Sequence, residues 1–233
     1  MTLPARNGRI RIGILGCAEI ARRSMIPAIL SLRDRFELVA VASRDRAKAE
    51  SFAARFGCRA IVGYESLLRP ELVDAVYVPL PAGLHPEWVG RALRAGLHVY
   101  VEKSLALGFE QAQEMVSEAT RGGRVLMEGF MFQYHRQQAV VRHLLSTDAI
   151  GPLRHFHGAF GFPPLPPGNF RYDAHLGGGA LFDAGAYPVR AACFLLGDQL
   201  EVRGAALHDD PTLGPAAFGS GFLARPDGVG ASV

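Results

Sequence analysis

The sequence predicts an α/β protein whose first half is a doubly wound parallel sheet with helices on both faces. Three observations predict it: short apolar runs alternate with amphipathic segments, the links between them are short, and a glycine-containing turn joins the first run to the first helix. Alternating strands and helices form parallel sheets because each helix returns the chain to the starting edge. We expect one domain over residues 1–127 and a second over 128–233.

Six strands and five helices account for the first half of the chain. The strands are apolar and rich in Val, Ile, Ala and Tyr, as buried parallel strands are; they are expected at 9–15, 36–42, 59–62, 74–78, 97–101 and 124–127. The helices carry charged residues on one side; they are expected at 19–32, 45–56, 64–68, 86–95 and 109–120. A ligand of such a sheet binds at the carboxyl ends of its strands.

The second half has a different pattern, typical of an α+β domain. Its expected helices are 134–146 and 180–196, the latter broken by Pro188. Its expected strands are 153–162, 201–207 and 216–224, and a loop with four prolines spans 163–168. Three strands make a small sheet, and no closing helix follows the last of them. We therefore expect this second domain to be incomplete.

Composition excludes several classes of protein. With 49% hydrophobic and 20% charged residues the chain is an ordinary globular protein, and it has no apolar run of the length that a membrane helix needs. The net charge of +3 is scattered, which argues against a nucleic-acid partner. The three cysteines form no C-x-x-C pair, and no apolar leader precedes the first strand, so we expect a cytoplasmic protein without disulfides or a metal site.

The turn after the first strand has the composition of a dinucleotide-binding loop. Counted from Gly16 it follows G-x-A-x-x-A, in which exposed backbone N–H groups and the helix dipole would bind a pyrophosphate. Its residues are Gly16, Cys17, Ala18, Glu19, Ile20 and Ala21. After the second strand, Ser43 offers a hydroxyl and Arg44 a planar fork suited to a 2′-phosphate, which favours NADP(H) over NAD. The neighbouring Asp45 is expected to cap the next helix.

Three further segments carry chemically capable side chains. The chain has 23 arginines but only two lysines, Lys48 and Lys103, and Lys103 follows Glu102 at the carboxyl end of the fifth strand. An ammonium group can give up a proton near neutral pH, which a guanidinium cannot do. His85 follows the fourth strand, and Asp183 and Tyr187, four residues apart, would share one helix face.

At these residues the sequence resembles the Gfo/Idh/MocA oxidoreductases, whose strand-end Glu-Lys-Pro motif appears here as Glu102-Lys103-Ser104. Within that family it is similar to the NDP-hexose 3-ketoreductases, which share the G-C-A-x-I-A turn, V-P-L-P-x-x-x-H-x-E-W, P-P-L-P and L-G-G-G-A-L-x-D-x-G-x-Y-P. The resemblance implies a Rossmann domain followed by an open-faced sheet domain. It also implies NADPH-dependent reduction of the 3-keto group of a dTDP-linked 3,4-diketo-2,6-dideoxyhexose.

The resemblance also implies roles for single residues. Residues 16–21 would hold the pyrophosphate, Ser43 and Arg44 the 2′-phosphate, and Glu102 would approach the nicotinamide. Tyr64, Leu80 and His85 would line the cofactor cleft. Lys103 would act at the reacting centre, Asp183 and Tyr187 would face it from the second domain, and Arg23 and Arg171 would bind the sugar or diphosphate.

The alkoxide that forms when hydride reaches the keto carbon needs a proton from a positioned acid. Lys103 and Tyr187 are both candidates, and we expect them to share this work. Two alternatives remain: a dehydrogenase of free sugars or polyols in the same family, and a truncated regulatory relative that binds NADP without turnover. Family members are longer than this chain, and we expect a homo-oligomer through the second-domain sheet.

Overall fold

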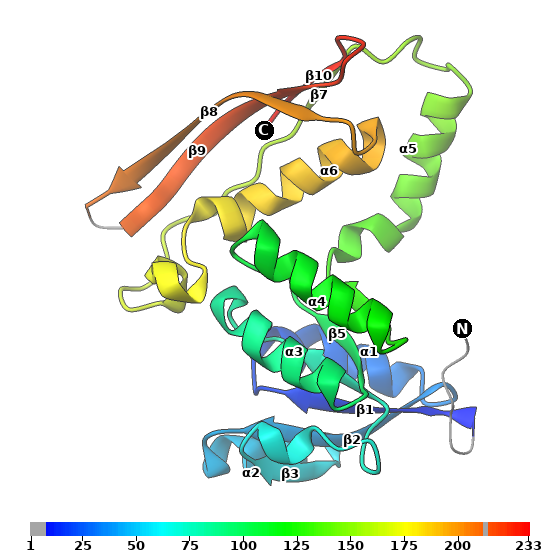
Figure 1. Ribbon diagram of the computed structural model, residues 1–233, viewed down its shortest axis with the longest axis vertical. Coiled ribbons are helices and arrows are strands. Elements are labelled where there is room, and N and C mark those ends of the chain that lie inside the picture. Colours follow the sequence, from blue (N-terminus) through cyan, green and yellow to red (C-terminus); the bar gives the residue numbers. More distant parts are fainter. Residues whose placement is uncertain (1–7, 212–213) are drawn as a thin grey trace. The chain divides into compact units, whose positions relative to one another are not determined.

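The chain folds into two compact units, Met1–Gly129 and Phe130–Val233 (Figure 1). The computed structural model describes residues 8–211 and 214–233. Within these residues no helix is both long and apolar enough to cross a membrane. Each unit is described here by itself.

The first unit is built on a six-stranded sheet in the order β3-β2-β1-β4-β5-β6, and all of its neighbouring strands are parallel. The strands are β1 (Ile10–Leu15), β2 (Phe36–Ser43), β3 (Arg59–Val62), β4 (Ala75–Val78), β5 (His98–Val101) and β6 (Leu126–Glu128). All six strands predicted from the sequence are thereby confirmed. The strand order reverses between β1 and β4, which is the point where open α/β sheets bind their ligands.

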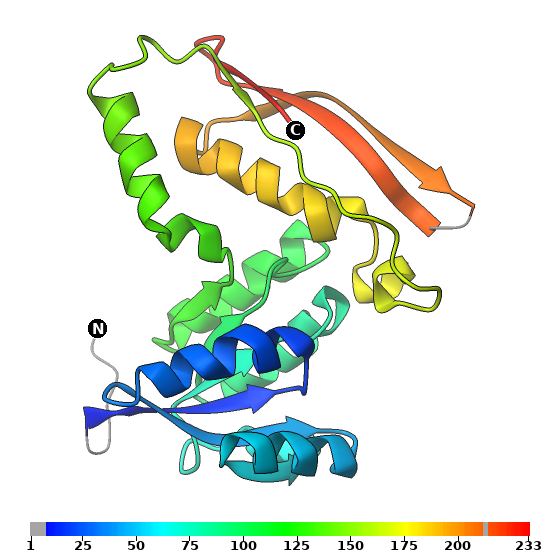
Figure 2. The same cartoon turned by 180° about the vertical axis from the view of Figure 1, so that it is seen from behind.

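Helices cover both faces of this sheet (Figures 1 and 2). They are α1 (Ile26–Ser31), α2 (Arg46–Phe56), α3 (His85–Arg94) and α4 (Phe109–Arg121). Side chains of α3 and α4 form one buried cluster with the sheet, around Val89, Leu93 and Met115. Ile26 and Ile29 of α1 and Ala53 of α2 form a second cluster with the opposite face. The strands are apolar on both sides because both of their faces are buried.

Local sequence signals set several helix ends in this unit. Asp45 caps α2, since its side chain accepts a hydrogen bond from Lys48 N at 3.2 Å, as expected. Gly57, at φ 69°, ends the same helix in the left-handed conformation. The expected helix 19–32 is α1 preceded by a π-helical turn, Ala21–Met25, and the expected helix 64–68 is a 3₁₀ turn, Glu65–Leu67.

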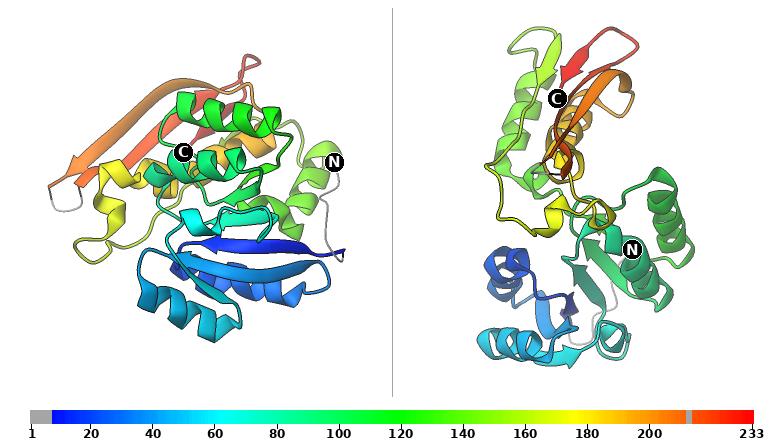
Figure 3. Two further views of the ribbon diagram at one scale, coloured as in Figure 1. Left: turned by 60° about the horizontal axis from the view of Figure 1, so that its bottom comes forward. Right: turned by 90° about the vertical axis from the view of Figure 1, so that its left-hand side faces the viewer.

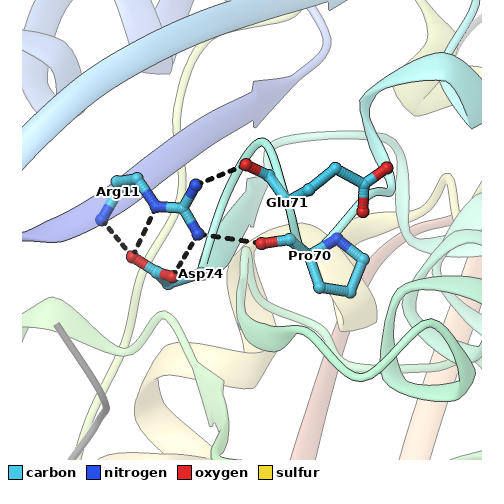
Figure 4. Close-up of polar contacts among 4 residues, drawn as sticks. All are labelled: Arg11, Pro70, Glu71 and Asp74. Atoms are coloured by element: carbon cyan, nitrogen blue, oxygen red, sulfur yellow. Dashed lines mark hydrogen bonds and ion pairs between the residues drawn. The ribbon is translucent and has the colours of Figure 1, made fainter. Parts of the chain in front are cut away.

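An ion pair fastens β1 to β4 at the amino ends of the strands, the edge opposite to the glycine turn (Figure 4). Asp74 accepts hydrogen bonds from Arg11 Nε at 3.1 Å and Nη2 at 2.7 Å, and from Arg11 N at 2.8 Å. The same guanidinium donates to the carbonyls of Pro70 and Glu71 at 2.8 and 2.6 Å. Burial raises the pKa of Asp74, but its hydrogen bonds to Arg11 outweigh burial, so the net shift is downward.

The second unit contains a four-stranded mixed sheet in the order β7-β10-β9-β8 (Figure 3). Its strands are β7 (His155–His157), β8 (Glu201–Asp210), β9 (Gly214–Ala224) and β10 (Gly230–Ser232), and its helices are α5 (Arg136–Ser146) and α6 (Ala186–Leu196). Ala192 and Leu196 of α6 pack on Leu223 and Ala231 of the sheet. β8 and β9 pair antiparallel as a long hairpin.

Three predictions for this unit are wrong in detail. The strand expected at 153–162 is only His155–His157, because only these residues pair with β10. β10 itself was missed, since its small residues lack the pattern of a strand and only its pairing to β7 and β9 makes it one. Pro188 does not break its helix: residues 180–196 are helical throughout, and Pro188 directly follows the π-helical turn Leu181–Gly185, where the regular α-helical hydrogen-bond pattern is already interrupted.

Candidate active site

Gly16 ends β1 at the strand-order reversal, and its backbone requires glycine. Its φ is 123°, and a Cβ placed there would lie 2.9 Å from Leu80 Cδ2 and 3.9 Å from the Tyr64 hydroxyl. Its N–H donates to the carbonyl of Ala42 at 3.0 Å, which ties the turn to the end of β2. The structure thus brings together Gly16, Tyr64 and Leu80, three of the residues expected at the cofactor.

The rest of the glycine turn leads into the π-helical segment. Ala18 O accepts a hydrogen bond from Arg22 N at 3.1 Å, and Ala21 is fully buried against the sheet. Cys17 and Ile20 are half-buried, and burial raises the pKa of the Cys17 thiol. Glu19 pairs with Arg22, whose Nε lies 2.7 Å from Glu19 Oε2, whereas Arg23 is exposed. A turn of small residues that leads into a helix is the kind of segment that binds phosphate through backbone N–H groups.

The end of β2 presents one basic side chain. Ser43 is buried, and its Oγ accepts a hydrogen bond from Asp45 N at 3.1 Å, so its hydroxyl shapes the turn. Arg44 is exposed, and its guanidinium carbon lies 6.0 Å from the centre of the Tyr64 ring. The Asp45 carboxylate is used as the helix cap. The group offered to a ligand at this strand end is therefore cationic.

The ends of β4 and β5 are joined through a buried pair of side chains. The Tyr77 hydroxyl donates to Glu102 Oε1, and the Tyr77 ring stacks on Tyr100 with 5.4 Å between ring centres. Burial raises the pKa of Glu102, and burial together with the Glu102 charge raises the pKa of Tyr77. Lys103 follows directly, and the peptide bond between Lys103 and Ser104 is cis.

Two residues that support this segment were missed in the sequence. The apolar pattern predicts Tyr77 only as part of a strand and gives no role to Glu128 at the end of β6, although Glu128 Oε1 accepts a hydrogen bond from Leu105 N at 2.7 Å. The available signal was positional, because both residues lie near the carboxyl ends of strands that neighbour β5. Tyr77 and Glu128 thus hold the residues on either side of Lys103 and Ser104.

His85 is the first residue of α3, and its side chain is completely buried, with 0% exposure. Its Nδ1 lies 2.9 Å from the carbonyl oxygen of Ser104, and its Nε2 lies 2.8 Å from the carbonyl oxygen of Leu80. Burial lowers the pKa of the imidazole, although the carbonyl contacts act in the opposite direction. The ring lies inside the unit, between the loops that follow β4 and β5.

In the second unit, two of the expected residues form an ion pair. Asp183 lies in a π-helical turn, Leu181–Gly185, and its Oδ2 accepts a hydrogen bond from Arg171 Nε at 2.7 Å. The Gly177–Gly179 stretch allows this approach, because a Cβ on Gly178 would lie 2.6 Å from the Arg171 carbonyl oxygen. Close backbone packing thus explains Gly178, and the positive φ values of 86° and 104° explain Gly177 and Gly179.

Tyr187 follows on α6, within a cluster of aromatic side chains. Its ring centre lies 5.3 Å from that of Phe160, 5.8 Å from Phe130 and 6.4 Å from Phe132. Its hydroxyl lies 3.9 Å from Met131 Sδ. The Tyr187 ring is therefore held in place by packing against other aromatic rings.

The strand order of the first unit, with a glycine turn at the reversal point, defines the Rossmann class of dinucleotide-binding domains. Residues 10–130 match the family model described as an oxidoreductase family with an NAD-binding Rossmann fold, and residues 139–233 match the GFO/IDH/MocA C-terminal domain. The chain belongs to the Gfo/Idh/MocA family of oxidoreductases, as the motifs indicated.

Its relatives include nucleotide-sugar reductases. The chain is 48% identical over 220 residues to a dTDP-3,4-didehydro-2,6-dideoxy-alpha-D-glucose 3-reductase from Saccharopolyspora spinosa, covering 94% of this chain and 66% of that protein. It is 45% identical to the Actinomadura kijaniata protein of the same name, covering all of this chain and 70% of the relative. The chain thus spans about two thirds of the length of these relatives.

A solved structure of similar fold is KijD10, a 3-ketoreductase from Actinomadura kijaniata in complex with NADP and TDP-benzene. The TM-score is 0.92 at 45% sequence identity, and the match covers 96% of this chain and 69% of KijD10. An aldose-aldose oxidoreductase from Caulobacter crescentus has a similar fold at 27% identity, with a TM-score of 0.87. The fold is therefore shared by enzymes with different sugar substrates.

Proposed function

We propose that the chain is an NADPH-dependent 3-ketoreductase that acts on a dTDP-linked 3,4-diketo-2,6-dideoxyhexose. The observation that carries the proposal is the placement of Lys103 at the end of β5, with Glu102 anchored beside it, in a chain 44–48% identical to several reductases of that name. Residues 1–127 would bind the cofactor, and residues 128–233 would bind the sugar nucleotide.

The residues at the carboxyl edge fit NADP(H). Gly16 keeps the strand end clear where a Cβ would meet Leu80, which leaves the backbone open to a pyrophosphate. Arg44, exposed next to Tyr64, supplies positive charge for the 2′-phosphate. When bound, NADPH supplies the hydride for the keto carbon. Leu80 and Tyr64 would bound the cleft by packing against the cofactor.

The chain's own groups would hold the sugar and supply the proton. Lys103 donates a proton to the developing alkoxide, or Tyr187 does so, since both side chains are acids of suitable type. Arg171 would bind the diphosphate or sugar through N–H groups that Asp183 keeps oriented, and Arg23 would add charge at the glycine turn. Glu102, anchored by Tyr77, would fix the floor of the site near the nicotinamide.

The test is the rate of NADPH oxidation by the purified chain, supplied with freshly prepared dTDP-3,4-diketo-2,6-dideoxyhexose, beside a titration of NADPH binding. Substrate-dependent oxidation with a 3-hydroxy sugar nucleotide as product supports the proposal. Binding of NADPH without turnover would instead favour a regulatory role. Oxidation of free polyols with NADP, without reduction of the sugar nucleotide, would favour a polyol dehydrogenase.

The exposed side of the second-unit sheet favours self-association. Phe218 is 58% exposed and Phe222 is 44% exposed, and the two residues, four apart on β9, lie on the same face of the hairpin, opposite to Leu223. We propose that this face forms the contact between copies of the chain. Light scattering should then give a multiple of 25.1 kDa, and Phe218→Asp together with Phe222→Asp should reduce the mass to one copy.

A further inference from the structure

The side chain of His85 contacts the backbone of two loops instead of an open cleft, which indicates a role other than direct contact with the cofactor. The side chain is fully buried, and both ring nitrogens face backbone carbonyl oxygens, those of Ser104 and Leu80, at 2.9 and 2.8 Å. Carbonyl oxygens only accept hydrogen bonds, and a neutral imidazole carries one N–H. Because burial disfavours the charged ring, a neutral His85 donates to one of these carbonyls at a time.

The carbonyl at Nδ1 belongs to the residue that directly follows Lys103. A hydrogen bond from Nδ1–H to this carbonyl oxygen would hold the backbone from which the Lys103 side chain extends. Tyr77 holds Glu102 on one side, and Glu128 holds Leu105 on the other, so the backbone between them is what His85 contacts. The related Glu-Lys-Pro motif has a proline at the position of Ser104, and the proline ring fixes the backbone angle φ. Serine leaves this angle free, so a hydrogen bond to the Ser104 carbonyl can restrict the backbone here.

We propose that His85 is a positioning residue that donates from Nδ1–H to the Ser104 carbonyl and thereby aims the Lys103 ammonium group. Because its side chain has no exposed surface, the His85 ring would not line the cofactor cleft as expected and would act without touching substrate or cofactor. It acts through the chain, by keeping the loop after β5 in register with the loop after β4. The catalytic part of the inference rests on the proposed ketoreductase function, whereas the placement of Lys103 does not.

The chain provides an internal probe of this placement, because Lys48 and Lys103 are its only lysines. Reductive methylation with ¹³C-formaldehyde labels both lysine amines and the N-terminal amine, and the Lys48→Arg and Lys103→Arg variants assign the two lysine signals in an NMR spectrum. Lys48 lies exposed on α2 and serves as the reference within each sample. The methyl signal of Lys103 then reports the surroundings of its amine without requiring turnover.

Two variants separate the two contacts of the ring. The side-chain amide nitrogen of asparagine lies near the place of Nδ1, and that of glutamine near the place of Nε2. His85→Asn therefore keeps the donor for Ser104, and His85→Gln keeps the donor for Leu80. His98→Gln is the matched control, since His98 is also buried and begins β5 at the opposite edge of the sheet.

We expect the Lys103 signal to shift in His85→Gln and to stay in place in His85→Asn and His98→Gln, with Lys48 unchanged throughout. In the NADPH oxidation assay, kcat should fall about 10- to 100-fold in His85→Gln, with KM for NADPH unchanged, and should largely survive in His85→Asn. If the wild-type chain does not oxidise NADPH with this substrate, the proposed function is contradicted. The NMR comparison would still decide the role of His85.

Equal shifts of the Lys103 signal in both His85 variants, a shift in neither, or a shift in His85→Asn alone would overturn the inference. Should the variants not fold, the unmodified protein gives the answer: a long-range ¹H–¹⁵N spectrum identifies which ring nitrogen of His85 carries the proton. Protonation at Nδ1 supports the proposal, and protonation at Nε2 alone contradicts it.

Discussion

The two units of the chain differ in how much of their sheets they bury. In the first unit, α1 and α2 cover one face and α3 and α4 the other, so that strand residues such as Ile14, Val41 and Val76 have at most 1% exposure. In the second unit, α6 packs on the sheet, but nine of the ten residues of β8 are exposed. Rigid placement of reactive groups is therefore best supported in the first unit.

The largest expected effect concerns which unit supplies the proton. Lys103→Met removes the ammonium group at similar volume, and we expect kcat in the NADPH oxidation assay to fall about 10²- to 10⁴-fold, with NADPH affinity retained. Tyr187→Phe is the matched change in the second unit. If kcat falls more in Tyr187→Phe than in Lys103→Met, the proton donor is Tyr187 in the second unit. Lys48→Met is the control and should leave kcat unchanged.

The second prediction compares the packing of the two units directly. Leu97 has 0% exposure in the first unit, so Leu97→Ala should lower the free energy of unfolding by about 2–5 kcal/mol. Val202 is 69% exposed on β8, so Val202→Ala should lower the free energy of unfolding by no more than about 0.5 kcal/mol. Urea titrations measure both. A loss at Val202 as large as that at Leu97 would mean that β8 is covered in solution.

The third prediction concerns the clamp between β1 and β4. Arg11→Ala leaves the Asp74 carboxylate without its cationic partner, and we expect a loss of about 1.5–3 kcal/mol in urea titrations. Arg9→Ala is the control: its pair with Glu37, whose side chains are 42% and 46% exposed, should contribute less than about 1 kcal/mol. If both variants lower the free energy of unfolding equally, the partly buried Arg11–Asp74 pair stabilises the protein no more than the exposed Arg9–Glu37 pair does.

The smallest effect is a dependence of stability on pH. Burial first, and the charge of Arg124 second, lower the pKa of His98, while Asp74 opposes them. The Nδ1 atom of His98 accepts a hydrogen bond from Val125 N at 2.9 Å, which requires the neutral ring. Protonation thus favours the unfolded chain, and stability should fall as the pH drops below about 6.5.

Urea titrations at several pH values between 8 and 5 would measure this slope. His98→Asn retains an acceptor for Val125 N but cannot be protonated, so its stability should fall less with decreasing pH than that of the wild type. If the free energy of unfolding depends on pH equally in both proteins, His98 does not cause the dependence. His85, whose pKa is also lowered by burial, should contribute in the same direction to the slope that remains.

The sequence was a better guide to the first unit than to the second, for a physical reason. Strands buried on both faces are apolar throughout, so β1, β2 and β4 were recognisable, as was the capping role of Asp45. β10 is defined by its pairing with β7 and β9, and a three-residue strand of small side chains has no local signature. The π-helical turn that precedes Pro188 likewise has no signature in the hydrophobic pattern.

The site was predictable as a set of residues and not as a set of contacts. The glycine turn and Lys103 are marked by their position at strand ends. The burial of His85, the bond from Tyr77 to Glu102 and the pairing of Arg171 with Asp183 join residues between 5 and 25 positions apart. No periodicity encodes such contacts, because they depend on how loops pack against each other.

Among the residues that the structure describes, β8 pairs with β9 alone, so one row of its backbone groups is available to another strand. Such an edge invites copies of a protein to aggregate, and charged side chains along it are a common defence. β8 carries Glu201, Arg203, Asp209 and Asp210. Because salt screens charges between separate molecules, concentrated samples of this chain should remain clear longest at low ionic strength.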